Sequence, residues 1–544
     1  MKGNFDNSGS LVRFILRRER VTSAVWILLI VAFSVGLAPA LGGMFGDAES
    51  KADLMGMLEN PSMIAMVGPA YGLESDYNTG ALYANFMLLW VIITVGIMNI
   101  FLIVRHTRSD EEKGRAEVVR SLPAGRLSNL NAAMLTAVMV NAALALLTGF
   151  GIAAAGVEGM DFTGSMLYGV ALGVSGLFFA AVAALFCQLS ASSRGASGLS
   201  IVTLGLLYMM RAAGDMNSDA EILSWISPMG LIQRSQIFVE NFWWPSLVVL
   251  LITVFVTALA YLLNAKRDLG QGFIAARPGR KNASSLLSSP TGLAFRLLRN
   301  SMTGWFIGIF IIGAAYGTIL GTEDFNNFVE TNEFYGQLIG SIPGFSTTQM
   351  FVSMITSIGA FIAVIPALTA ALKLRGEEKE GRAEHLLSRS VSRVRYLSGY
   401  TLIAFAASVL MQCGTALGIY SVASAALADT PGSSITLGYL LKANLVYLPA
   451  LWVMIGLAVL MVGALPKAAA AVWGYYGFSF FLMFIGRLPD LIPGWLQKST
   501  PFAFIPQLPI EEITLLPLAV LTLIAAGLTA AGLFFYKKRD MLTV

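Results

Sequence analysis

Long apolar stretches separated by short polar segments constrain this chain more than any other feature. Twelve stretches are long enough to cross a bilayer as helices, which takes around 20 residues. They lie near 22–41, 82–104, 128–155, 164–190, 195–212, 244–264, 303–320, 350–372, 396–425, 436–463, 468–486 and 513–536. A transmembrane barrel would instead show shorter segments of alternating polarity. Charged residues make up only 12% of the chain, about half of what a soluble protein carries. The sequence predicts an all-α polytopic membrane protein with about 12 transmembrane helices.

The distribution of basic residues predicts the topology. Of the 36 Lys and Arg residues, 30 fall on alternate connecting segments, on the side that also carries both termini. Positively charged loops are retained in the cytoplasm. We therefore expect the N- and C-termini to be cytoplasmic. A chain of this design, without a recognisable targeting signal, fits the cytoplasmic membrane of a bacterial cell.

A charged block occurs twice, after the second and the eighth apolar stretch. Residues 108–126 and 375–393 align without gaps, and eight of the nineteen positions are identical. The tripeptide Lys-Arg-Asp also recurs, at 266–268 and 538–540. Markers repeated in the same order indicate a tandem duplication. We predict a first six-helix repeat at 1–269, a cytoplasmic linker at 270–290 and a second repeat at 291–544.

The two repeats are expected to have the same internal plan and the same orientation in the membrane. Each begins with an amphipathic, Arg-containing lead helix, at 10–20 and at 292–300, expected at the inner membrane surface. An even number of spans per repeat makes the repeats parallel, as in transporters built from parallel repeats. Broken or re-entrant helices are expected at 213–243 and 487–512, and long external segments at 42–81 and 321–349.

The charged block is predicted to form a helix that docks on a partner. Glu111 and Arg115 stand four residues apart, as do Glu378 and Arg382, which favours one helix with a charged face. The alternative is an ordinary positively charged cytoplasmic loop. Such a loop requires Arg and Lys, but not glutamates at matched positions in both copies. No pattern for nucleotide binding, metal binding or nucleophilic catalysis occurs in the chain, so we expect neither an enzyme nor a nucleic-acid-binding protein, and no cofactor or metal site.

The pattern R-x-[DE]-E-x-x-G-R-A-E, followed by eight residues and Arg, resembles the permeases of ABC-2-type ABC transporters. The duplicated chain is similar to the branch of polyketide-antibiotic or tetronasin-type exporters, with a type V exporter-like fold. The resemblance implies that each block, at 105–127 and at 373–395, is a coupling segment that contacts a separate ABC ATPase. That partner is expected as a homodimer, two copies per chain, which binds ATP and Mg. The residues carried over to coupling are Arg108, Glu111, Gly114, Arg115, Glu117, Arg126, Arg375, Glu378, Gly381, Arg382, Glu384 and Arg393.

Several residues in the apolar stretches are candidates for a substrate pathway. Lys442 is a charge inside a predicted span, where it binds an acidic substrate group or else extends to the membrane surface. The other candidates are Asn444, Tyr208, Met209, Tyr475, Tyr476 and Phe480, for which helix packing is the alternative role.

Together with these features, the family resemblance implies an ATP-driven exporter of a hydrophobic or amphipathic small molecule, antibiotic-like or lipid-like, across the cell membrane. Two alternatives remain open. One is a twelve-span secondary transporter of the major-facilitator type, and the other is a membrane scaffold that transports nothing.

Overall fold

The computed structural model describes residues 3–42, 58, 61–73, 77–121, 123–274, 281–320, 345–426, 436–485 and 493–540. These residues form helices and connecting turns, without strands. The chain divides into two compact units, Met1–Gly279 (unit 1) and Arg280–Val544 (unit 2). Most of the long external segments expected at 42–81 and 321–349, and positions 275–280 of the expected linker, lie outside the described residues.

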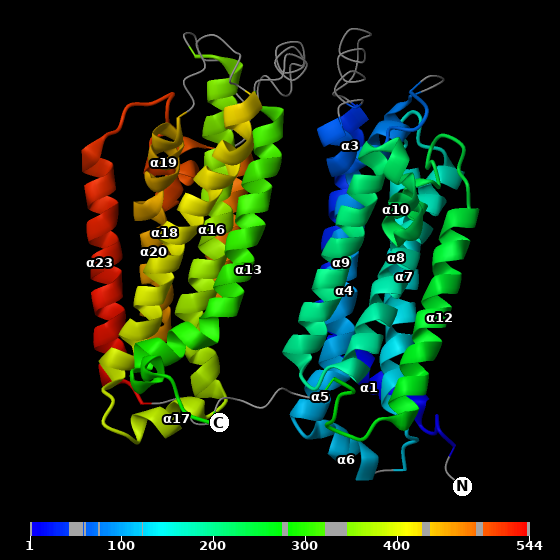
Figure 1. Cartoon of the computed structure of the whole chain (residues 1–544), viewed down its shortest axis with the longest axis horizontal. Coiled ribbons are helices and arrows are strands. Elements are labelled where there is room, and N and C mark those ends of the chain that lie inside the picture. Colours follow the sequence, from blue (N-terminus) through cyan, green and yellow to red (C-terminus); the bar gives the residue numbers. More distant parts are fainter. Residues whose placement is uncertain are drawn as a thin grey trace. The chain divides into compact units, whose positions relative to one another are not determined.

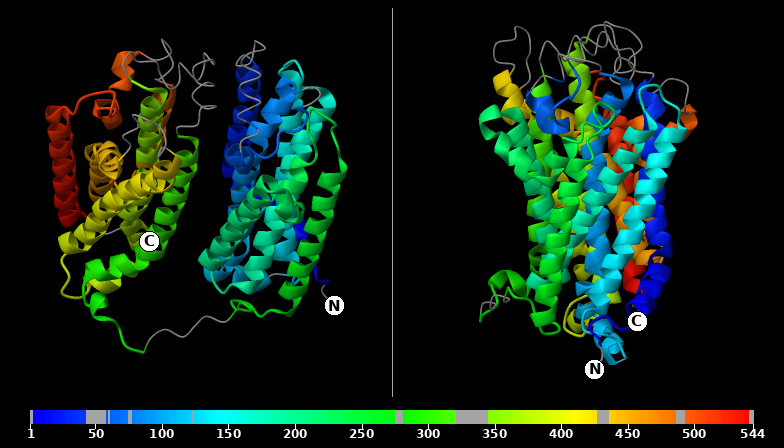
Figure 2. Two further views of the ribbon diagram at one scale, coloured as in Figure 1. Left: turned by 45° about the horizontal axis from the view of Figure 1, so that its top comes forward. Right: turned by 90° about the vertical axis from the view of Figure 1, so that its right-hand side faces the viewer.

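Among its described residues, unit 1 has six helices that are long and apolar enough to cross a membrane (Figures 1 and 2). They are α1 (Ser8–Gly42), α4 (Thr79–His106), α7 (Ser128–Ala154), α8 (Phe162–Leu189), α9 (Ser193–Met216) and α12 (Trp244–Lys266). Polar side chains begin three of them by accepting a hydrogen bond from a free backbone N–H, Asn78 for α4, Asp161 for α8 and Ser192 for α9. Helix α8 is the most deeply buried and packs against α4, α7, α9 and α12. The hydrophobic core of unit 1 therefore surrounds α8.

The described part of unit 2 contains five membrane-length spans. They are α13 (Pro290–Ile319), α16 (Thr347–Lys379), α18 (Arg393–Ala426), α19 (Leu437–Leu445) continued by α20 (Leu448–Ala464), and α23 (Leu515–Lys538). The span α19/α20 is interrupted near Tyr447 because Pro449 lacks the N–H that would continue the helix. The expected span 468–486 contains α21 (Ala471–Ile485), whose 15 residues end at the edge of the described range. The described residues thus hold eleven candidate spans rather than twelve.

The lead segments are not separate helices. Residues 10–20 are the first turns of α1, and residues 292–300 the first turns of α13, each helix running on without a break. No Gly or Pro stands between Arg20 and Val35 to end α1. Within α1, the Glu19 carboxylate is buried and lies 2.7 Å from Nε2 of His106 and 3.0 Å from Nη1 of Arg105. This polar contact holds the lead segment against α4.

Short helical pieces occupy the stretches where broken helices were expected. They are α10 (Glu221–Ile226) and α11 (Pro228–Gln233) in unit 1, and α22 (Gly494–Gln497) and η3 (Pro501–Phe504) in unit 2. Ser227-Pro228 begins α11 and Thr500-Pro501 begins η3, each with proline in the first helical turn, where its missing N–H costs nothing. The two repeated dipeptides therefore perform the same local task in both units.

Buried amide side chains connect the helices of unit 1, as expected for polar groups inside a helix bundle. Asn99 on α4 and Asn141 on α7 exchange two hydrogen bonds, with N···O distances of 3.0 and 2.7 Å. Asn85 donates to the carbonyl oxygens of Gly68 and Pro69, and Asn131 accepts from the Tyr261 hydroxyl. Asn99, Asn131 and Asn141 thus form hydrogen bonds between helices, whereas Asn85 binds the non-helical residues before α4.

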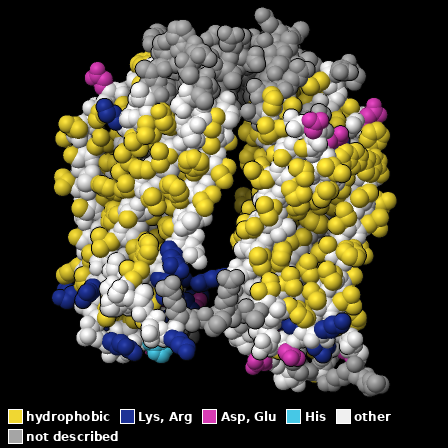
Figure 3. All heavy atoms as spheres, in the orientation of Figure 1, with side chains coloured by type: hydrophobic (Ala, Val, Ile, Leu, Met, Phe, Trp, Pro, Cys, Tyr) yellow, Lys and Arg dark blue, Asp and Glu magenta, His cyan; other side chains and the backbone are white. Residues whose placement is uncertain are grey.

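The outer helices of each unit expose large apolar side chains. Phe255 on α12 is 71% exposed and Leu523 on α23 is 72% exposed. Figure 3 shows hydrophobic side chains covering the flank of each unit, with most of the visible Lys and Arg gathered at one end of the unit. Such an apolar band bounded by basic residues is the surface that a bilayer covers.

Candidate functional site

Each charged block is a helix, a glycine turn and a second helix. In unit 1, α5 (Arg108–Glu112) is followed by Gly114 with φ of 69° and then α6 (Arg115–Ser121). In unit 2, α16 continues to Lys379, Gly381 has φ of 71°, and α17 (Arg382–Leu387) follows. A glycine in the left-handed region ends a helix because only a residue without Cβ adopts it at little cost. The expectation of a single helix through each block is therefore wrong.

The glycine turn also changes the ion pairs. Arg115 pairs with Asp110 at 3.1 Å, not with Glu111, because the turn between them redirects the chain. Arg382 pairs with Glu377 at 2.6 Å and with Glu380, not with Glu378. The hydrogen bond with Glu377 raises the pKa of Arg382, which stays protonated. Arg115 and Arg382, the arginines that directly follow the glycines, are thereby held against the glycine turn of their own block.

We predict that Gly381→Ala lowers the stability of unit 2 by about 1–2 kcal/mol, since the left-handed backbone penalises any Cβ. No atom lies within 4 Å of the added Cβ, so the cost is conformational alone. Gly376→Ala in helical α16 is the matched control, and there alanine should stabilise by about 0.5–1 kcal/mol. Thermal unfolding in detergent measures both changes. A shift in the same direction for the two variants would contradict the prediction.

The first arginine of each block, Arg108 or Arg375, binds a main-chain carbonyl of the loop that follows the fourth span, and Arg108 also binds two carbonyls that follow the last helix of unit 1. Arg108 is 1% exposed and donates to the carbonyl of Ala191 at 2.6 Å, and also to those of Gly270 and Gln271. Arg375 donates to the carbonyl of Lys467 at 3.2 Å. The corresponding arginines thus make corresponding contacts in the two units.

The inner glutamate of each block pairs with the arginine of the Lys-Arg-Asp tripeptide that follows the last helix. Glu111 lies 2.5 Å from Nη2 and 2.9 Å from Nη1 of Arg267. Glu378 lies 2.5 Å from Nη2 of Arg539. We call Glu111–Arg267 and Glu378–Arg539 the anchoring pairs. The pairing of the tripeptide arginine with the block was not predicted from the sequence. The signal for this pairing was that the tripeptide and the charged block recur at similar spacings in the two repeats.

The last arginine of each block contacts the same tripeptide. Arg126 donates to the carbonyl oxygen of Arg267 at 3.0 Å, and Arg393 donates to that of Arg539 at 2.5 Å. Both blocks are therefore fixed near their start and at their end to one residue after the last helix of the unit.

The Arg-Ala-Glu tripeptide after each glycine faces outward except for its alanine. Ala116 and Ala383 are buried, at 7% and 0% exposure. Glu117 and Glu384 are exposed, and neither makes an ion pair or side-chain hydrogen bond within the described part of the chain. Of the twelve residues assigned to coupling, these two glutamates are the acidic groups that remain free to meet another molecule.

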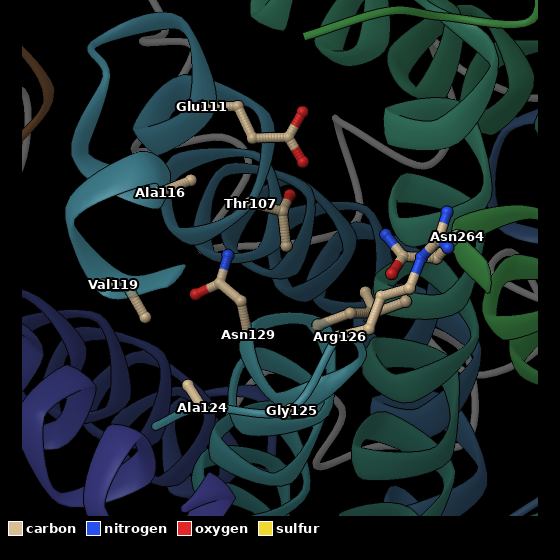
Figure 4. A pocket seen from close by; sticks show the side chains of 10 residues that line it. Thr107, Glu111, Ala116, Val119, Ala124, Gly125, Arg126, Asn129 and Asn264 are labelled. Atoms are coloured by element: carbon tan, nitrogen blue, oxygen red, sulfur yellow. The ribbon is translucent and has the colours of Figure 1, made fainter. Parts of the chain in front are cut away.

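A cavity of about 20 Å³ separates the first block from the helices beneath it, which is room for one or two water molecules. Figure 4 shows the side chains of Thr107, Glu111, Asn129 and Asn264 around it. Thr107 lies between α4 and α5, and the other three groups come from α5, α7 and α12. The first block therefore rests on a polar, hydratable surface. Val119 lines the cavity, whereas Val118 is 67% exposed. Leu122 lies outside the described residues.

The residues proposed for a substrate pathway have varied surroundings. Met209 and Lys442 are exposed, while Asn444 is buried and donates to the carbonyl of Leu440. The Tyr208 hydroxyl donates to the carbonyl of Met66 at 3.0 Å. In unit 2, the Tyr475 hydroxyl donates to the main-chain carbonyl of Ser499, and the Tyr476 hydroxyl donates to that of Phe361. The ring of Phe480 lies 5.6 Å from that of Phe361. Among the described residues, no group of three or more His, Cys, Asp or Glu side chains is placed to hold a metal ion.

Comparison with known proteins decides the family. The family model described as "Multidrug efflux system permease Rv1217c, C-terminal domain" matches residues 12–263 and 287–537. The chain belongs to this family. It is 31% identical over 547 residues to the multidrug efflux system permease protein Rv1217c of Mycobacterium tuberculosis (strain ATCC 25618 / H37Rv), covering 99% of this chain and 96% of that protein. Together with its apolar helices, this relationship identifies the chain as a multi-pass permease of the cell membrane. A permease is a transport subunit, in agreement with the expectation from the sequence.

Proposed function

We propose that this chain is the transmembrane subunit of an ATP-driven ABC exporter of the ABC-2 type, with both permease halves in one polypeptide. It exports hydrophobic or amphipathic small molecules, drug-like or lipid-like, from the cytoplasm. The family relationship supports a permease for drugs, and the repeated blocks support a partner that contacts the chain twice. That partner is a separate ABC ATPase, in two copies, which binds ATP and Mg.

One observation carries the assignment of the partner. In each unit, the first arginine, the inner glutamate and the last arginine of the block are engaged within the unit. Glu117 and Glu384 are left exposed beside an exposed arginine. The same pair of outward charges, presented once by each unit, suits two copies of one subunit, since identical partners require matching surfaces.

In this mechanism the chain performs no covalent chemistry. The blocks receive the movement of the ATPase dimer and pass it to the helices of each unit, so that a substrate path opens to one side of the membrane at a time. Lys442, Asn444, Tyr208, Met209, Tyr475, Tyr476 and Phe480 are the residues proposed for that path. Exposed Lys442 suits an acidic substrate group, and the rings around Phe361 suit an apolar one.

The test is purification of the tagged chain from its own membranes in mild detergent, with mass spectrometry and an ATP-hydrolysis assay on the proteins that accompany it. We expect an ATPase at two copies per chain. The double variant Glu117→Lys/Glu384→Lys should lose it, because a reversed charge faces the same partner surface with repulsion. Glu158→Lys/Glu512→Lys is the matched control, as both glutamates are exposed and lie outside the blocks.

Recovery of the wild-type chain without any ATPase would overturn the proposal and favour the secondary transporter. Equal retention of the ATPase by both double variants would overturn the docking role of Glu117 and Glu384. Retention of the ATPase by the control alone, with loss in the block variant, supports the proposal in full.

A further inference from the structure

The anchoring pairs are buried ion pairs at matching places in the two units. The side chains of Glu111 and Arg267 are 8% and 4% exposed, and those of Glu378 and Arg539 are 0% and 12% exposed. Each pair joins the charged block, which follows the second span, to the residue after the last span of the same unit. The contact is between segments 156 residues apart in unit 1 and 161 apart in unit 2.

Stability alone is a weak reason for such a pair. Removing two charges from water costs several kcal/mol per ion, and replacing a buried ion pair with apolar side chains of similar volume is often neutral or stabilising. What a charged pair adds is a fixed geometry, particularly where an arginine offers two N–H groups to one carboxylate, as Arg267 does to Glu111. The last arginine of the block adds a second attachment to the same residue.

The helices that end at these arginines, α12 and α23, lie on the outside of their units. Helix α12 packs mainly on α8, and α23 mainly on α20, and both expose most of their length. Each of these helices therefore has one main neighbouring helix within its unit. The buried ion pair of each helix lies at one of its ends, where the block is.

We propose that Arg267 and Arg539 are positioning residues that transmit movement of the charged blocks to the last helix of each unit, α12 and α23. This inference rests on the proposed function, because the movement is delivered by the ATPase. It differs from docking, since the anchoring pairs face the unit and Glu117 and Glu384 face away from it.

The test detects movement of α23 in the complex with the ATPase, with a fluorophore at the end of the helix that is remote from Arg539. Leu516 is 77% exposed in the first turn of α23, at the opposite end of that helix from Arg539. A bimane fluorophore is attached to Leu516→Cys in a Cys413→Ala background, since Cys187 is buried and inaccessible to the label. ATP and Mg are then added and the change in fluorescence is recorded, with partner binding and melting temperature measured on the same samples.

The decisive variant is Glu378→Met/Arg539→Met, which replaces the pair with apolar side chains. We expect the ATPase to stay bound and the melting temperature to be preserved, while the ATP-dependent signal falls about fivefold or more. Lys537→Met is the matched control, because it removes an exposed charge from the same helix end, and it should leave the signal unchanged. If the double variant does not fold, Glu378→Gln removes the charge while keeping the shape, and should lower the signal about twofold or more.

A full signal in a folded variant, with the ATPase bound, would show the anchoring pair to be structural only and would overturn the inference. The same holds if the wild-type complex shows no ATP-dependent signal at residue 516. A wild-type chain that binds no ATPase would instead overturn the proposed function, which the purification experiment detects separately.

Discussion

Replacing Arg211 with Met is expected to destabilise unit 1 by about 3–5 kcal/mol, the cost of removing one partner from a buried ion pair. Arg211 is fully buried on α9 and lies 3.4 Å from Asp215. It also donates to the carbonyls of Ile64 and Ala65, at 3.1 and 2.8 Å. The change leaves the Asp215 carboxylate without its buried cation and removes one donor from each of the two carbonyl groups.

The carbonyls belong to the last turn of α3 (Pro61–Val67). That of Ile64 also accepts from the backbone N–H of Gly68 at 2.8 Å, and that of Ala65 from the Tyr208 hydroxyl at 3.4 Å. Tyr208 and Gln233 donate to the next two carbonyls, those of Met66 and Val67. The positively charged guanidinium also interacts favourably with the negative end of the helix dipole. Arg211 therefore fixes α3 to α9, and its loss should release that contact.

Thermal unfolding of the purified chain measures the effect of Arg211→Met. Arg194→Met is the control, since Arg194 is exposed on the same helix and should change stability little. Arg211→Lys should give an intermediate loss, because one ammonium cannot reproduce the planar fork of the guanidinium. An Arg211→Met chain as stable as the Arg194→Met chain would refute this account of α3.

The second large effect is expected for Gly532→Ala, which should lower the free energy of unfolding of unit 2 by about 1–3 kcal/mol through overpacking. A Cβ at Gly532 would lie 2.6 Å from the carbonyl carbon and oxygen of Val459 and 2.7 Å from the nitrogen of Leu460. All three are backbone atoms of α20, which cannot rotate away as a side chain does. Helix α23 must shift, and Arg539 at its end shifts with it.

Gly527→Ala on the same helix is the control, because nothing lies within 4 Å of its added Cβ, and alanine there should stabilise by about 0.5–1 kcal/mol. Melting temperatures of the two variants should therefore move in opposite directions. If the transmission role of Arg539 holds, Gly532→Ala should also weaken the ATP-dependent signal at residue 516. Equal melting temperatures for the two variants would contradict the close approach of α20 and α23.

Hydrophobic lengths were sufficient to place most helices, since a helix must satisfy its own backbone hydrogen bonds in a bilayer. The boundaries predicted for the span 128–155 agree with α7 to one residue, and those for 164–190 agree with α8 to two. The lead segments could not be predicted in the same way. Amphipathic spacing at 10–20 and 292–300 does not indicate whether the helix continues into the next span. Burial of Glu19 against Arg105 and His106 depends on α4, which lies about 85 residues away in the chain.

The sequence by itself determined the tandem duplication, the presence of membrane-spanning helices and the position of the two charged blocks. These features depend on local composition and on order along the chain. Only the tertiary structure decided which charges of the blocks point inward. Glu111 and Glu117 have the same chemistry, and so do Glu378 and Glu384. The inner member of each pair is selected by an arginine more than 150 residues later and by a glycine turn that rotates the outer member away. That selection depends on long-range packing, which no local pattern encodes.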